Sequence, residues 1–296
     1  MFTNVIVGVD ESESGRDAIA LAIDLMSEGG RLTFAFVYHS DPPIWLGMSA
    51  ASNAARREQG LAALQDAARD AGADARLCSL GSTSVGRGLH DLCEDEDADL
   101  LVLGSSRRTV VGRVLLGDDS RAALNGAPCA IAIAPAGYAQ QPRLFAEIGV
   151  GYNGEPESEH ALAVARELAD EHQATLSAFQ AVSIPAIALS TGPAPVDEWM
   201  QDLLDDARRR VSALEDVEPH AVYGQASEEL AMFSASVDLL VVGSRGYGPL
   251  GRLVHGSTSN ELARVSCCPL LVLPRAAWNT NSPADPGNAA EMRAGT

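Results

Sequence analysis

Four small residues toward the end of the chain have the types and spacing of a phosphate-binding loop. Gly243, Gly246, Gly256 and Ser257 form the pattern G-x2-G-x9-G-S, which follows the apolar segment 238–243 and precedes a segment with helical periodicity. Glycine adopts positive φ freely and lets a ligand approach the main chain, and a helix N-terminus offers unpaired N–H groups with a partial positive charge. Because phosphate oxygens accept such hydrogen bonds, the pattern predicts a phosphate cradle.

The same loop pattern occurs a second time, in the first half of the chain. GSSRRTVVGRVLLGDDS at 104–120 aligns with GSRGYGPLGRLVHGSTS at 243–259, and Asp99, Cys129 and Pro135 align at the same offset with Asp238, Cys268 and Pro274. A repeat of this extent predicts two copies of one fold, each the size of a single domain. We therefore expect a first domain at 1–138, a second at 144–275, a polar joint between them and a disordered tail at 276–296.

Short β-branched runs alternate with amphipathic stretches in both halves, which predicts an α/β fold. Such alternation favours a Rossmann-like, doubly wound parallel sheet with right-handed crossovers in each domain. Thr258 and Glu261 fit a capping box, which places a helix start near Ser257. The helix expected before Asp238 in the second half is somewhat shorter than the corresponding helix of the first half. In the first half we expect strands at Val5–Val9, Leu32–Tyr38, Ala75–Leu80, Leu100–Leu103 and Ala130–Ala134, and helices at Gly15–Glu28, Ala54–Ala71, Val85–Glu96 and Asp119–Leu124.

The composition excludes several functional classes. The net charge is −19 with a pI of about 4.6, so nucleic acids and anionic membranes are not expected partners. Every one of the 21 cationic side chains is arginine, which excludes a G-K-[ST] loop and a Schiff-base lysine. No apolar run reaches membrane-spanning length, which predicts a cytoplasmic protein. The five cysteines form no C-x-x-C pair and the six histidines lack zinc-like spacing, so we expect reduced thiols and no metal site.

Together these segments resemble a tandem universal stress protein of the ATP-binding branch. The resemblance rests on VIVGVDES at 5–12, DLLVVGSRG at 238–246, the spaced loop and CPLLVLP at 268–274. It implies an open five-stranded parallel sheet of order 3-2-1-4-5 in each domain, with ATP between the ends of strands 1 and 4. It also implies a role in stress-response regulation through a protein partner. Because family members pair through their last strands, it further implies an intramolecular pseudo-dimer of the two domains, and we expect the whole chain to form a homodimer.

The resemblance assigns the second domain a complete phosphate-binding half-site. Gly243, Gly246, Gly256 and Ser257 match the family's phosphate-binding positions, and Ser259 adds a hydroxyl. Arg252, like Arg245, could supply positive charge to a triphosphate. It could equally have a structural role, because Arg113 occupies the equivalent position in the first half.

The nucleoside-contacting aspartate of the family corresponds to Asp10 in the first domain and to Asn153 in the second. An amide can still donate and accept hydrogen bonds to a nucleoside. Alternatively, Asn153 is only a turn residue ahead of Gly154.

The first domain departs from the loop pattern at two positions. Arg107 stands where Gly246 stands, which penalises positive φ, and Asp118 stands where Ser257 stands. A carboxylate ~4 Å from a phosphate repels it by roughly 1 to 4 kcal/mol. We therefore expect poor ATP binding there. The simpler interpretation of the acidic pair is that Asp118 or Asp119 caps its own helix.

Three functional classes follow. The first is an ATP-binding regulatory module, with or without Mg²⁺. The second is a slow ATP hydrolase, although the loop has no evident general base or Mg²⁺-binding carboxylates, so no catalytic residue is predicted. The third is a nucleotide-independent stress scaffold whose loop is only a tight turn.

Overall fold

Strands and helices alternate along the chain, as the sequence predicts. The structure, a computed structural model, describes residues 1–10, 12–40, 48–105, 114, 118–140, 144–183, 196–244 and 257–274. The first half contains β1 (Phe2–Gly8), α1 (Glu13–Leu25), β2 (Met26–His39), α2 (Met48–Ala71), β3 (Arg76–Ser82), α3 (Val85–Asp95), β4 (Leu100–Gly104), α4 (Asp118–Leu124) and β5 (Ala130–Ala134). The second half contains β6 (Glu147–Gly151), α5 (Pro156–His172), β7 (Thr175–Val182), α6 (Val196–Ser212), β8 (Glu218–Tyr223), α7 (Ala226–Phe233), β9 (Leu239–Gly243), α8 (Ser257–Val265) and β10 (Leu270–Leu273).

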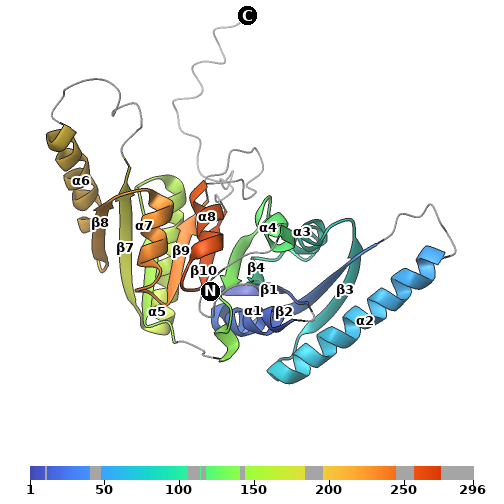
Figure 1. The fold of residues 1–296 in the computed structure, drawn as a ribbon. Helices are drawn as coiled ribbons and strands as arrows, with labels where there is room; N and C mark the ends of the chain where they lie inside the picture. Colours follow the sequence, from blue (N-terminus) through green and yellow to red (C-terminus); the bar gives the residue numbers. More distant parts are fainter. Residues whose placement is uncertain are drawn as a thin grey trace, which may run out of the picture.

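Two five-stranded parallel sheets join into one sheet of ten strands, in the order β3-β2-β1-β4-β5-β10-β9-β6-β7-β8. Each half therefore has the predicted order 3-2-1-4-5, and the α/β doubly wound prediction is confirmed. At the junction β10 pairs antiparallel with β5, with Leu271 opposite Ala132. Figure 1 shows the two halves side by side with β10 at this junction.

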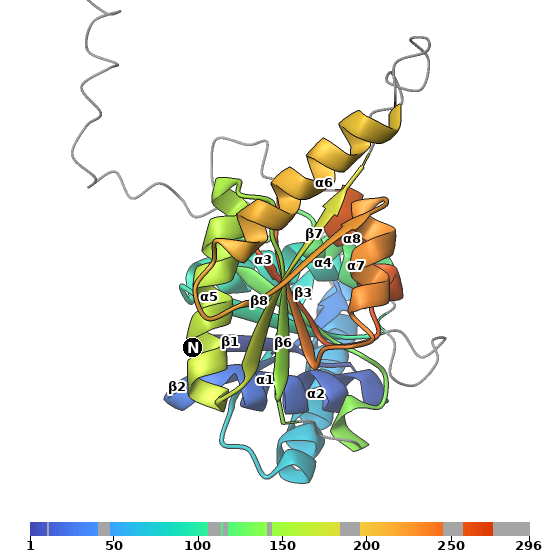
Figure 2. The same ribbon diagram turned by 90° about the vertical axis from the view of Figure 1, so that its left-hand side faces the viewer.

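Alternating side chains of the strands build one core on each face of the sheet. Val5 and Val7 of β1 belong to the core under α1, α2, α5 and α6, whereas Ile6 belongs to the core under α3, α4, α7 and α8. Figure 2 shows α5 and α7 on opposite sides of strands β6 to β8. Both cores contain residues of both halves, so hydrophobic packing continues across the junction.

The helix predicted at Gly15–Glu28 ends earlier, at Leu25, and β2 begins at once with Met26. Met26 pairs with Phe2, and the register shifts before Asn4, so an irregular strand takes up the residues assigned to the helix end. Gly29 within this stretch has a φ of 75°, a conformation that glycine adopts without strain. In the second half α7, with 8 residues, is shorter than α3, with 11, as predicted.

The connection between the halves is held by two aspartates of α1. It contains the short 3₁₀ helix η2 (Tyr138–Gln140). Asp17, which is 5% exposed, accepts hydrogen bonds from the backbone N–H groups of Gly137 at 2.8 Å and Ala139 at 2.9 Å. The hydroxyl of Tyr138 donates to Asp24 at 2.7 Å. Burial raises the pKa of both carboxyl groups above the usual aspartate value. Of the helices within the described ranges, none is long and apolar enough to span a membrane.

Candidate functional site

A cavity of about 900 Å³ opens at the carboxyl ends of the strands of the second half. It lies where β6 and β9 end side by side, at Gly151 and Gly243, and where the chain connections leave in opposite directions. Such a switch point is the general ligand-binding position of open α/β sheets. The apolar part of the wall comes from Phe179, Ala181, Val182, Met200, Leu230 and Val242, and the hydroxyl and amide groups come from Tyr152, Asn153, Ser158, Ser183, Tyr223, Gln225, Ser227, Thr258 and Ser259.

Three helices begin at this cavity. Ser158 of α5, Ser227 of α7 and Thr258 of α8 all lie in first turns and line its wall. A helix N-terminus carries a partial positive charge and unpaired N–H groups. The cavity is therefore suited to an anionic ligand, even though the described wall contributes the carboxylates of Glu155 and Glu157 and no cationic side chain.

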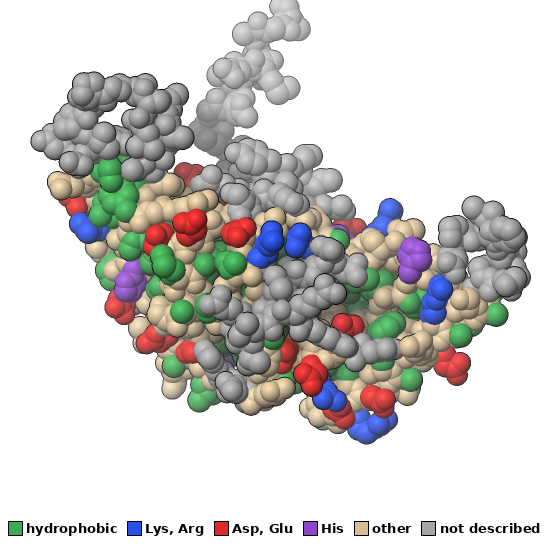
Figure 3. Space-filling view, in the orientation of Figure 1, with side chains coloured by type: hydrophobic (Ala, Val, Ile, Leu, Met, Phe, Trp, Pro, Cys, Tyr) green, Lys and Arg blue, Asp and Glu red, His purple; other side chains and the backbone are tan. Residues whose placement is uncertain are grey.

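Charged side chains of both signs lie on one face of the molecule (Figure 3). Figure 3 shows carboxylates and guanidinium groups scattered over one face, without a large patch of a single sign. Arg245 and Arg252, which could supply positive charge to phosphates from the loop, lie outside the described residues.

The structure brings together four of the predicted site residues. Gly243 ends β9, Ser257 begins α8, Ser259 is 7% exposed in the first turn of α8, and Asn153 follows β6. Of these, Gly243, Ser259 and Asn153 line the cavity. Gly246, Arg252 and Gly256 lie outside the described residues, and Asp10 lies in the other half, away from this cavity. The predicted helix start near Ser257 is confirmed, but Thr258 lies inside α8 and not at the capping position before it.

Gly243 has a steric role that does not depend on a ligand. A Cβ at this position would lie 2.3 Å from the carbonyl oxygen of Glu157 in the first turn of α5. In the first half a Cβ on Gly104 would lie 2.0 Å from the carbonyl oxygen of Ser14 in α1. Both halves therefore need glycine here so that a helix can approach the strand end, whatever the following loop binds.

Asn153 and Asp10 make the same turn in the two halves. Oδ1 of Asn153 accepts a hydrogen bond from the backbone N–H of Glu155 at 3.1 Å, and Oδ1 of Asp10 accepts one from that of Ser12 at 2.9 Å. Asp10 also accepts from the hydroxyls of Ser12 and Ser14. The turn interpretation of Asn153 is therefore confirmed for its carbonyl end, whereas its Nδ2 makes no hydrogen bond with the described residues.

Tyr152 is a cavity residue that the sequence analysis missed. Its hydroxyl donates to Oε1 of Glu159, one turn into α5. Burial, reinforced by the neighbouring carboxylate of Glu159, raises the pKa of Tyr152 to about 12, so the phenol remains a neutral donor at neutral pH. The equivalent residue of the first half is Val9, so comparison of the two repeats did not indicate a role for Tyr152.

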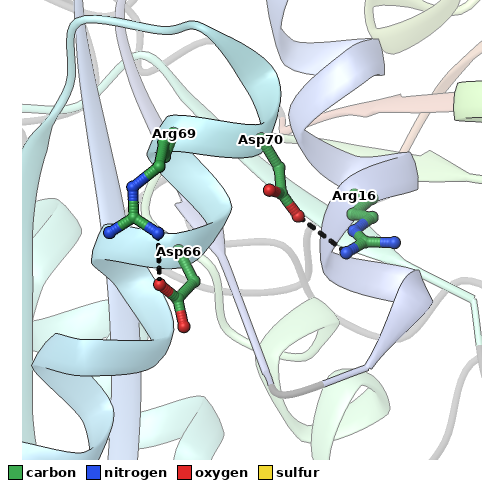
Figure 4. A network of polar contacts seen from close by, with 4 residues as sticks. All are labelled: Arg16, Asp66, Arg69 and Asp70. Atoms are coloured by element: carbon green, nitrogen blue, oxygen red, sulfur yellow. Dashed lines mark hydrogen bonds and ion pairs between the residues drawn. The ribbon is translucent and has the colours of Figure 1, made fainter.

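The first half offers a different, acidic surface at the end of its first strand. A groove of about 430 Å³ between α1 and α2 is lined by Asp10, Glu13, Asp66 and Asp70, with Arg16 as the cation. Arg16 pairs with Asp70 at 2.7 Å and Arg69 pairs with Asp66 at 2.9 Å, and Figure 4 shows both pairs. The excess of carboxylates disfavours phosphate there.

The acidic pair of the first half's loop lies within α4. Asp118 and Asp119 are the first two residues of that helix, where an acidic residue is favoured by the helix dipole. A capping residue would stand before them, so the predicted capping by Asp118 or Asp119 is misplaced by at least one residue.

The buried thiols are poorly suited to nucleophilic chemistry. All five cysteines are free, with Cys93, Cys129 and Cys268 buried. Burial raises the pKa of Cys268 to about 12, and contact with Cys129 together with burial raises the pKa of Cys93. A thiol held neutral in this way is a poor nucleophile. Among the residues that the structure describes, no group of three His, Cys, Asp or Glu side chains could hold a metal ion.

Comparison with known proteins identifies the family. The model of the universal stress protein family matches residues 1–135 and 145–274. Universal stress proteins of Mycobacterium tuberculosis and Mycobacterium bovis are 29% identical over 283 residues, which cover 90% of this chain and 96% of theirs. A universal stress protein structure from Archaeoglobus fulgidus matches with a TM-score of 0.63 at 17% identity, covering 92% of this chain and 98% of that one. The chain thus belongs to the universal stress protein family, whose domain it contains twice in tandem.

Proposed function

We propose that the second half binds ATP in the 900 Å³ cavity and that the protein is a nucleotide-binding regulator of a stress response. The observation that carries this proposal is the position of the loop ends. The G-x2-G-x9-G-S segment leaves β9 at Gly243 and re-enters α8 at Ser257, and residues on both sides of it line the cavity. The volume is in the range of small-molecule sites.

Two different parts of the cavity wall would contact the base and the phosphates of the nucleotide. The side chains of Phe179, Val182 and Met200 offer apolar surface for a base. Ser259 and the starts of α7 and α8 offer hydroxyl and N–H groups for phosphates, to which Gly246, Gly256, Ser257 and Arg252 would contribute from the loop. A Mg²⁺ ion bound with the nucleotide would offset the charge of Glu155 and Glu157 on the same wall.

The proposal extends to the organisation of the chain. We assign the domains to 1–138 and 144–275, joined as a pseudo-dimer through β5 and β10, with 276–296 as a tail. The first domain, with Arg107 and Asp118 in its loop, does not bind ATP well. We also propose that the protein acts in the cytoplasm, that the whole chain forms a homodimer, and that it acts on a protein partner rather than as an efficient enzyme.

Calorimetric titration of ATP into the nucleotide-stripped full chain tests this function. We expect one site per chain, and at least about tenfold weaker binding in Gly246→Arg, because the substitution introduces the residue found at position 107. Arg107→Ala is the matched control and should bind like the unaltered chain. Absence of binding heat would overturn the proposal in favour of a nucleotide-independent scaffold, and product accumulation over hours would show a slow hydrolase instead.

A further inference from the structure

Val114 links the altered loop of the first half to the second half. Its backbone N–H donates to the carbonyl oxygen of Ser266 at 2.8 Å, and its side chain is 0% exposed in the core shared by the two halves. Ser266 follows the last residue of α8 and is itself 0% exposed. The loop that has lost the phosphate-binding pattern thus carries a docked residue.

The docking point and the cavity lie at opposite ends of the same helix. Thr258 and Ser259, in the first turn of α8, line the cavity, whereas Ser266 receives Val114 directly after the last turn. The nine residues of α8 span about 13 Å. A shift of the first turn would therefore be carried along the backbone hydrogen bonds of this short helix to Ser266.

A second helix connects the same two places. Ser227 and Leu230 of α7 line the cavity. Ser234, directly after α7, accepts a hydrogen bond at 2.8 Å from the backbone N–H of Cys267, the residue after Ser266. The hydroxyl of Ser266 donates to the carbonyl oxygen of Cys268 at 2.9 Å. The ends of α7 and α8 are therefore tied together where Val114 docks.

We propose that nucleotide binding in the second half is coupled to the docking of Val114 on Ser266, so that the first half's loop reports occupancy of the second half's site. This inference rests on the proposed function, because the ligand of the cavity is the nucleotide. Coupling of this kind is reciprocal: if ATP stabilises the docking of Val114, that docking strengthens ATP binding by the same factor. The altered loop then has a regulatory use in place of phosphate binding.

Amide hydrogen exchange of Val114, measured by NMR on the full chain with and without saturating ATP, tests the coupling. We expect ATP to slow exchange of this amide by about fivefold or more, the lower end of typical allosteric coupling. The backbone amide of Ala132 is the internal control, because Ala132 pairs with Leu271 across the same junction without involving α8. Equal slowing of both amides would indicate general tightening of the junction and would overturn the proposal.

A matched pair of variants tests the reverse direction. Val114→Ala keeps the backbone donor but removes buried packing, and Val102→Ala removes the same atoms at a fully buried site in β4 of the first half. We expect ATP affinity to fall at least about threefold in Val114→Ala and to stay unchanged in Val102→Ala. Unchanged affinity in Val114→Ala, together with unchanged Val114 exchange, would overturn the coupling and leave ATP binding standing. Absence of ATP binding in the unaltered chain would overturn both proposals.

Discussion

Gly104 and Gly243 are sterically equivalent, because each ends a strand against the first turn of a helix that begins after a neighbouring strand. A Cβ would lie 2.0 Å from the carbonyl oxygen of Ser14 in one case and 2.3 Å from that of Glu157 in the other. Only one of the two glycines precedes the intact loop pattern. Their shared environment makes it possible to separate a role in folding from a role in binding.

Replacing either glycine with alanine should destabilise the protein in the absence of any nucleotide. We expect Gly104→Ala and Gly243→Ala each to lower the free energy of unfolding by about 2 kcal/mol or more, since the added methyl group displaces a helix backbone. Urea unfolding of the nucleotide-free chain measures this. A normal unfolding midpoint in Gly243→Ala would show that this glycine serves only ligand binding.

Asp17 should be important for holding the connection between the halves. Asp17→Ala leaves the N–H groups of Gly137 and Ala139 without their acceptor in a buried place, and we expect a loss of about 1 to 3 kcal/mol of stability. Urea unfolding would be compared with Glu13→Ala, an exposed residue of the same helix. Equal midpoints for the two variants would mean that water replaces the aspartate without cost.

Asp24 should make stability depend on pH in a defined direction. Burial raises the pKa of Asp24 in the folded state above 3.8, so its contribution is fully present below that value and is lost as pH rises through the raised pKa. Asp24→Asn keeps an acceptor for Tyr138 and cannot titrate. Its stability relative to the unaltered chain should therefore increase from ~pH 4 to ~pH 7 in urea unfolding. A constant or opposite difference would contradict this assignment.

The exposed ion pair between Arg16 and Asp70 should contribute little. The side chains are 60% and 50% exposed, so water and salt screen their attraction. Asp70→Asn is expected to change the free energy of unfolding by less than about 1 kcal/mol, and added salt should reduce even that effect. A larger loss in the free energy of unfolding would show that the ion pair holds α1 and α2 together despite its exposure.

Restoring the loop pattern should create a second ATP site. Arg107→Gly combined with Asp118→Ser in the full chain removes the steric penalty and the carboxylate from the first half's loop, so calorimetry should detect a second equivalent of ATP. Adding Gly246→Arg to this variant removes binding in the second half, so the remaining ATP binding is that of the new site in the first half. No gain in binding would show that other residues of the first half also exclude the nucleotide.

The sequence was sufficient to predict the strands, because their signals are local and repeated, whereas the order of the strands followed from the resemblance to the universal stress protein family. Leu239–Gly243 is a short apolar run bounded by polar residues, and its recurrence at Leu100–Gly104 supported the same assignment twice. The early end of α1 could not be predicted in this way, because Met26 joins β2 through pairing with Phe2, a contact outside its own segment.

Parts of the site escaped prediction because they depend on contacts between distant segments. The sequence does not show whether a glycine accommodates a phosphate or a neighbouring helix. For Gly243, the close approach of the carbonyl oxygen of Glu157 in the structure shows that it accommodates a helix. The hydrogen bond from Val114 to Ser266 joins different halves, and no periodicity encodes it. The assignments of Gly246, Arg252 and Gly256 remain predictions.

The antiparallel pairing of β5 with β10 has an evolutionary consequence. In an assembly of two identical chains, every substitution appears on both sides of the junction. Here the two sides are covalently connected through residues 135–146, so at this junction each half meets the other half of the same chain. Tethering also keeps the local concentration high on dilution. A substitution in one half, such as Arg107 at the position that aligns with Gly246, therefore occurs on one side of the junction alone.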